Sequence, residues 1–205
     1  MGASKSDKAA SHQRIVSTAA ASIRRDGIGA LRVDELMREA GLTHGGFYRH
    51  FDSRDDLIAE AVDAALTDGS RRTEGAAAIG GLPALRTIID GYLSQLHRDA
   101  AEKGCAVGAL PADVARCSTS ARATYARHVR RYIKMLAGLT SPAKSQRTRE
   151  DEALLILSAL VGALSMARAV EETELSDEIL AGTARALHEF SANERRPAQM
   201  TRRRR

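Results

Sequence analysis

The stretch that decides the fold is residues 41–51, which read Gly-Leu-Thr-His-Gly-Gly-Phe-Tyr-Arg-His-Phe. Gly41 follows a short amphipathic segment and can take the positive φ angle that lets one helix stop and a second leave at a steep angle. Leu42, Phe47 and Phe51 lie near one another around the second helix, and we expect that side to pack inward. The pattern therefore predicts a helix-turn-helix.

The opposite side of the second helix carries small residues and hydrogen-bond donors. Gly45, Tyr48 and Arg49 lie there, with Thr43 and His44 at the first turn. Small residues let a helix lie deep in the major groove of DNA, while hydroxyl, imidazole and guanidinium groups reach phosphates and base edges. Each glycine costs about 1 kcal/mol relative to alanine inside a helix, so we expect this helix to be poorly stable alone.

Four pieces of the chain carry a family resemblance. They are Val33-Asp34-Glu35-Leu36, Gly41-Leu42-Thr43, Phe47-Tyr48-Arg49-His50-Phe51 and Ser53-Arg54-Asp55-Asp56-Leu57. Together, over residues 15–66, they resemble the DNA-binding domain of TetR-family transcriptional regulators. The chain departs from the family pattern at Arg32, Met37 and Gly46. From periodicity alone, the alternative is that this stretch is a turn between packed helices in the core of an all-helical protein that contacts no DNA.

The resemblance implies a DNA-binding site made of Arg32, Thr43, His44, Gly45, Tyr48, Arg49, His50 and Arg54. We expect His44 and the backbone near Gly45 to approach bases, and Arg49 could do this or bind a phosphate. Thr43, Tyr48, His50 and Arg54 are expected to hold phosphates and set the register. Arg32 stands where the family usually has a capping threonine or serine, and its guanidinium could reach a phosphate itself.

We expect an all-α fold of about nine helices, with an N-terminal three-helix helix-turn-helix DNA-binding domain and a larger helical ligand-binding and dimerisation domain. The first domain comprises residues 1–66 and includes the start of a connecting fourth helix, and the second comprises residues 67–194. Residues 195–205 form a basic tail that we expect to be disordered, and residues 67–81 are interpreted as a loose connection. Helices are expected over about residues 8–26, 53–66, 85–104, 111–115, 122–138, 149–170 and 177–192.

The segment 149–170 is apolar nearly all round, and such a helix must be covered on all sides. Small residues within it allow another helix to approach closely. We expect it to pair, together with the last helix, with the same two helices of a second copy. The resemblance implies the same, because TetR-family proteins usually dimerise through their last two long helices. The alternative is burial inside the monomer.

The net charge does not by itself indicate a nucleic-acid partner. The formal charge is +5, but six arginines lie in the last eleven residues, and without them 25 basic residues stand against 26 acidic ones. The N-terminus is polar and lacks the apolar core of a signal peptide, and no apolar run approaches the roughly 20 residues that a membrane helix needs. We therefore expect a cytoplasmic protein with no membrane partner.

No familiar catalytic signature is present, so we expect neither an enzyme nor a cofactor. His44 and His50 are six residues apart, which places them on different sides of a helix rather than at the spacing that binds a metal. Cys105 and Cys117 lack metal-ligand companions, and they support neither a disulfide nor a zinc site. Cys105, two residues after Lys103, is a candidate reactive thiol, although cysteine is more often simply buried.

The sequence thus predicts a homodimeric TetR-type regulator, most simply a repressor, that binds a palindromic operator in double-stranded DNA and is released by an unknown small-molecule effector. Activation instead of repression is also open. One alternative is a nonspecific DNA-coating protein that uses the tail Arg202 to Arg205. A second is a regulator that senses oxidants or electrophiles through Cys105. A third is a helical small-molecule-binding or catalytic domain whose N-terminal part contacts protein.

Overall fold

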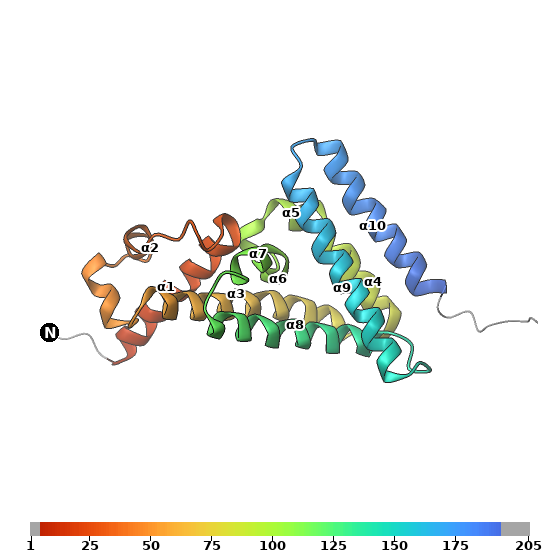
Figure 1. The fold of residues 1–205 in the computed structure, drawn as a ribbon, viewed down its shortest axis with the longest axis horizontal. Helices are drawn as coiled ribbons and strands as arrows, with labels where there is room; N and C mark the ends of the chain where they lie inside the picture. Colours follow the sequence, from red (N-terminus) through yellow and green to blue (C-terminus); the bar gives the residue numbers. More distant parts are fainter. Residues whose placement is uncertain (1–4, 194–205) are drawn as a thin grey trace, which may run out of the picture. The chain divides into compact units, whose positions relative to one another are not determined.

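In the computed structural model, residues 5–193 are described, and they form helices joined by short connections (Figure 1). This part of the chain contains no strand, which confirms the all-α prediction. The predicted basic tail, residues 195–205, lies outside the described residues. The elements are α1 (Lys5–Asp26), α2 (Val33–Glu39), η1 (His44–Arg49), α3 (Arg54–Ala77), α4 (Gly81–Tyr92), α5 (Gln95–Asp99), η2 (Ala101–Lys103), α6 (Ala106–Ala109), α7 (Pro111–Val114), α8 (Thr119–Leu139), α9 (Gln146–Ala169) and α10 (Thr173–Asn193), where η marks a 3-10 helix.

The described residues gather in two compact units. The first contains residues 5–72 and 99–131, and the second contains residues 73–98 and 132–193. Residues 99–131, although distant in the sequence, therefore share a unit with the N-terminal helices. The division into a DNA-binding domain (1–66) and an effector-binding domain (67–194) is a division by function, and it stays a prediction.

Helix α3 is longer than the sequence predicted. We expected it to end near Leu66 and a loose connection to follow, but the helix continues to Ala77. Gly69 and Ser70 are buried within it, and the Ser70 hydroxyl donates to the Leu66 carbonyl at 3.0 Å. Burial on this face outweighs the cost of about 1 kcal/mol that a helical glycine carries. The interpretation of residues 67–81 as a loose connection was therefore wrong for most of its length.

The predicted helix over residues 85–104 is interrupted. α4 ends at Tyr92, and the Ser94 hydroxyl accepts a hydrogen bond from the His97 amide at 3.1 Å, so a separate short helix, α5, begins. Short helices of this kind carry too few residues to show a periodic pattern, which is why the chain has more helices than expected. Pro111 opens α7 as predicted, and α9 and α10 lie within four residues of their predicted bounds.

The second unit packs around the inner face of α9. Ile156, Leu160 and Leu164 are buried there, and α10 covers them with Leu180 and Leu187. The outer face of α9 remains exposed, so within the described residues the helix is not covered on all sides. By length and composition alone α9 could also cross a membrane, with 44% of its most apolar stretch buried, but core helices of soluble proteins share this property.

Candidate DNA interface

The turn of the helix-turn-helix forms at Gly41, as predicted. Gly41 has a φ of +74°, and its amide donates to the Arg38 carbonyl at 3.0 Å. The Leu42 amide donates to the Met37 carbonyl at 2.8 Å. This pair of bonds is the Schellman motif, in which a glycine in the left-handed region closes the end of a helix. The motif stops α2 and sends the chain off at an angle.

The segment after the turn is a 3-10 helix, η1, rather than the α-helix that the spacing predicted. The Gly46 amide donates to the Thr43 carbonyl and the His50 amide to the Phe47 carbonyl, both at 2.9 Å. The two adjacent glycines favour this local tightening because they add no side-chain contacts that would stabilise an α-helix. Phe47 and Phe51 are both 3% exposed and stack with ring centroids 5.4 Å apart. The predicted inward face is therefore confirmed.

Most of the predicted DNA-binding residues are exposed on η1 or just before it. They are Thr43, His44, Gly45, Tyr48 and Arg49. Tyr48 is 74% exposed, and its ring rests edge-on against Phe47 with centroids 5.2 Å apart. Hydroxyl, imidazole and guanidinium groups thus face solvent from a segment whose other side is fixed in the core. This is an arrangement that can place polar groups in a groove of DNA.

Arg32 lies at the start of α2 and is exposed. It occupies the N-cap position, but within the described residues its side chain makes no capping hydrogen bond. Its Nε atom lies 3.6 Å from Glu35 Oε1, and both side chains are more than half exposed. Such a pair contributes little, so the guanidinium can exchange Glu35 for another anion at low cost.

His50 differs from the other predicted contacts because it is half-buried between helices. Its ring centroid lies 6.0 Å from that of His12 on α1, and its Nδ1 atom is buried without a hydrogen-bond partner among the described residues. Burial, followed by the charges of His12, Lys8 and Arg49, lowers the pKa of His50 below its ordinary value. The lowered pKa favours the neutral imidazole of His50 at pH 7.

Arg54 turns toward the backbone of the connection between α1 and α2. Its Nη2 atom donates to the Ile28 carbonyl at 3.1 Å and to the Leu31 carbonyl at 3.2 Å. A charged donor shared by two carbonyls holds this connection against the start of α3. The predicted phosphate contact of Arg54 stays a prediction, and the structure adds a bracing role that sequence reasoning missed.

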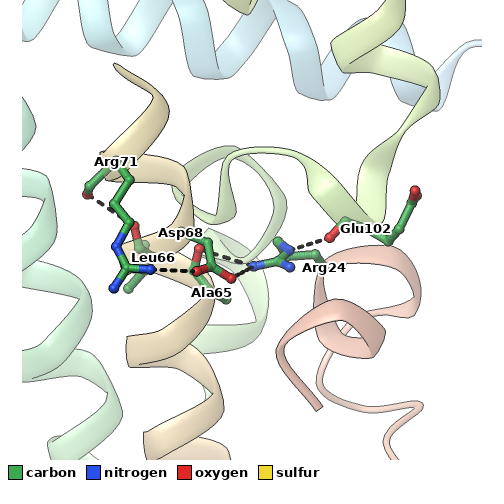
Figure 2. Close-up of polar contacts among 7 residues, drawn as sticks. Arg24, Ala65, Leu66, Asp68, Arg71 and Glu102 are labelled. Carbon is green, nitrogen blue, oxygen red and sulfur yellow. Dashed lines mark hydrogen bonds and ion pairs between the residues drawn. The ribbon is translucent and has the colours of Figure 1, made fainter. Parts of the chain in front are cut away.

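Arg24 is a second residue that sequence reasoning missed, and it ties α1 to two distant segments. Its side chain is buried, and its Nε atom donates to the Glu102 carbonyl in η2 at 2.6 Å (Figure 2). Its Nη1 atom reaches the Ala65 carbonyl of α3 at 3.3 Å and Asp68 Oδ2 at 3.5 Å. A buried arginine surrounded by acceptors fixes the geometry of the elements that supply them. No local pattern marks it, because its partners lie far along the chain.

Among residues 5–193, no group of three or more His, Cys, Asp or Glu side chains lies close enough together to hold a metal ion. The second unit has a small cavity beside the ion pair of Lys144 with Glu152, whose charged atoms lie 2.6 Å apart. Its enclosed space holds about one water molecule, so it is too small for an organic effector in this conformation.

Comparisons with known proteins agree with the fold. Residues 15–61 match the sequence profile described as bacterial regulatory proteins, tetR family. An uncharacterised helix-turn-helix-type transcriptional regulator of Mycobacterium tuberculosis is 32% identical over 99 residues, which are 48% of this chain and 50% of the relative. The chain thus spans about half the length of the curated relatives it matches.

Solved structures match over most of the chain. The reduced form of NemR from E. coli has a TM-score of 0.73 at 16% identity, covering 88% of this chain and 97% of that one. A TetR-family regulator from Cytophaga hutchinsonii also has a TM-score of 0.73 at 16% identity, covering 94% and 98%. A TetR regulator from Legionella pneumophila has a TM-score of 0.68 at 19% identity, covering 93% and 98%. At these identities the likeness establishes the fold.

Proposed function

We propose that this chain, which belongs to the TetR family of transcriptional regulators, is a repressor that binds a palindromic operator as a homodimer and is released by a small molecule. The observation that carries the proposal is the exposed polar surface of η1, fixed from behind by the buried Phe47 and Phe51. The family binds DNA and is usually dimeric, and its members are generally not enzymes. A cytoplasmic location follows from a partner that is chromosomal DNA.

In the proposed complex, residues 1–66 bind DNA, and each protomer places η1 in a major groove. Two such segments related by a dyad enter successive grooves about 34–36 Å apart on B-form DNA. His44 and the backbone at Gly45 approach base edges, while Thr43, Tyr48 and His50 hold phosphates. Arg49 and Arg32 add charge at the edge of this surface. His50 contributes an N–H donor, and its lowered pKa favours the neutral imidazole at pH 7.

The proposed dimer forms through α9 and α10, within residues 67–194. Leu155, Ser158, Gly162 and Met166 follow one another at helical spacing along the outer face of α9. Leu155 is 52% exposed and Met166 is 55% exposed. Small residues between two large apolar ones let a second helix approach closely, so this stripe suits the corresponding helix of another copy.

Release by an effector would be a coupling between two binding equilibria. A ligand in the second unit releases the operator only if it binds the DNA-free conformation more tightly than the DNA-bound one. Residues 67–194 are the proposed place for this ligand. Repression is the simplest outcome of binding an operator, and activation would follow if the operator lay upstream of the promoter.

The alternative functions gain less support. Cys105 is 7% exposed, so an oxidant or electrophile meets its thiol only after the surrounding residues move. Burial, followed by the charges of Asp113 and Asp55, raises the pKa of Cys117, which keeps this second thiol protonated and unreactive. A DNA-coating function would depend on the terminal arginines, which lie outside the described residues.

The test is fluorescence anisotropy with the full chain, DNA that flanks its own coding region and a scrambled duplex, at two salt concentrations. We expect the flanking DNA to bind at least about a thousandfold more tightly than the scrambled duplex. Equal and strongly salt-dependent affinities for flanking DNA and for a set of genomic fragments would overturn the proposal in favour of nonspecific coating.

A further inference from the structure

The connection between α1 and α2 is held by two side chains at a single residue, Ile28. The Ile28 amide donates to Asp113 Oδ2 at 2.9 Å, and the Ile28 carbonyl accepts from Arg54 Nη2 at 3.1 Å. Asp113 belongs to α7 and Arg54 to α3, so both side chains come from elsewhere in the first unit. The Ile28 carbonyl also accepts from the Leu31 amide at 3.3 Å, but among the described residues the Ile28 amide is bound only by the carboxylate of Asp113.

Gly27 makes room for the carboxylate of Asp113. It has a φ of +84°, and a Cβ atom added there would lie 2.8 Å from Asp113 Oδ2. A side chain at this position would both strain the backbone and push the carboxylate away from the Ile28 amide. The other oxygen, Asp113 Oδ1, accepts from Arg116 Nη2 at 2.9 Å, but the Arg116 side chain is 72% exposed, so solvent screens this pair and it contributes little. We call the contact of Asp113 with Gly27 and Ile28 the latch.

The latch lies just ahead of the elements that carry the DNA interface. α2 begins at Val33, five residues after Ile28, and its N-cap Arg32 makes no side-chain capping bond within the described part of the chain. The start of α2 therefore depends on the preceding connection and on the packing of α2 against α1, and not on a side-chain cap. Since α2 packs on η1, a shift of this connection moves the predicted base-contacting surface.

A second tie joins the same two parts of the first unit. Arg24, one helical turn before the connection, donates to the Glu102 carbonyl in η2, and Figure 2 shows it pointing from α1 toward that segment. α1 also packs against η2 and α6. Residues 101–116 thus contact the end of α1 through Arg24, and they contact the α1–α2 connection through Asp113. The position of residues 101–116 therefore influences the position of the α1–α2 connection.

We propose that Asp113 is a positioning residue for operator binding, which it controls by holding the Ile28 amide and through it α2 and η1. This inference rests on the proposed function, because it presumes that η1 reads an operator. It assigns a role in DNA recognition to a residue 85 positions away from the peptide it holds. Any change that moves residues 101–116 would then alter the fit of η1 to the operator without touching DNA.

The experiment compares the operator and scrambled duplexes with wild-type protein and the variants Asp113→Ala, Asp113→Asn and Arg116→Ala. Asp113→Ala should weaken operator binding by about tenfold, because a displaced η1 loses base contacts, and leave binding to scrambled DNA within about twofold. Asparagine keeps an acceptor for the Ile28 amide, so Asp113→Asn should stay within about threefold of wild type. Arg116→Ala, which leaves the latch in place, is the matched control and should behave like wild type.

Several outcomes would overturn the inference. One is an unchanged operator-to-scrambled affinity ratio in Asp113→Ala while hydrogen exchange shows that the Ile28 amide has become unprotected. Another is equal loss on both duplexes, which indicates a merely structural role. If Asp113→Ala does not fold, Gly27→Ala is used in its place. The same fall in the ratio of operator to scrambled affinity is expected, because the added Cβ displaces the carboxylate. Failure of the proposed function is distinguishable, since it shows as absence of operator preference in wild-type protein.

Discussion

Removing the polar end of Arg24 is the sharpest test of how the first unit is held together. Its side chain is 8% exposed and donates to the Glu102 carbonyl at 2.6 Å, to the Ala65 carbonyl at 3.3 Å and to Asp68 at 3.5 Å. Arg24→Met keeps an unbranched apolar stem of similar reach but deletes every donor. The acceptors remain, and the buried carbonyls lose a partner.

The loss in free energy of unfolding expected for Arg24→Met follows from these contacts. A hydrogen bond to a charged group contributes about 1.5–3 kcal/mol, and the short bond to Glu102 accounts for most of this. The pair with Asp68 adds little, because that side chain is 44% exposed and solvent screens it. Part of the loss is recovered because the guanidinium no longer has to be desolvated. We expect a net loss of about 2 kcal/mol, which lowers the midpoint of thermal unfolding by roughly 4–8 °C for a chain of this size.

Arg71 supplies a matched control, because it also pairs with Asp68 (Figure 2) but its side chain is exposed. Its Nη1 atom lies 3.9 Å from Asp68 Oδ1, and its side chain is 75% exposed. Arg71→Met should therefore change stability by less than about 0.5 kcal/mol. Thermal unfolding followed by circular dichroism measures both variants. Equal unfolding midpoints for the two variants would refute the reasoning, because the buried donor of Arg24 would then stabilise the fold no more than the exposed donor of Arg71.

Three further predictions concern the interface, the dimer and pH. His44→Ala should relax base preference at one or two operator positions at a cost of about 1–3 kcal/mol, and equal losses on operator and scrambled DNA would contradict a base-reading role. Leu155→Glu should convert the proposed dimer to monomer in analytical ultracentrifugation, because a twofold axis would place the new charge in the apolar interface twice. Leu96→Glu, at a position 79% exposed in α5, should remain dimeric. The folded state lowers the pKa of His50, so the unfolded state takes up its proton first, and stability should fall as pH drops below 6.5. His50→Gln should lose less stability between pH 7.5 and pH 5.5 in urea unfolding, and identical losses would remove His50 as the cause.

The candidate interface could be predicted from sequence because the signals that specify it are local. Gly41 and the spacing of Phe47 and Phe51 lie within eleven residues, so they show both the turn and its inward face. The exposed side then follows from helical geometry. The prediction was wrong in one local detail, since Gly45 and Gly46 give a 3-10 helix rather than an α-helix.

What only the tertiary structure decided are the contacts between residues far apart in the chain. Arg24 meets Glu102 across 78 residues, and the Ile28 amide meets Asp113 across 85. Neither residue carries a periodic or motif signal, and nothing near Arg24 marks it as buried. The continuation of α3 past Gly69 has the same origin, because packing against distant elements overrides the weak local preference of glycine. Local sequence thus determined the turn and the exposed surface that we propose for DNA binding, whereas long-range hydrogen bonds and burial decided which parts of the chain hold that surface in place.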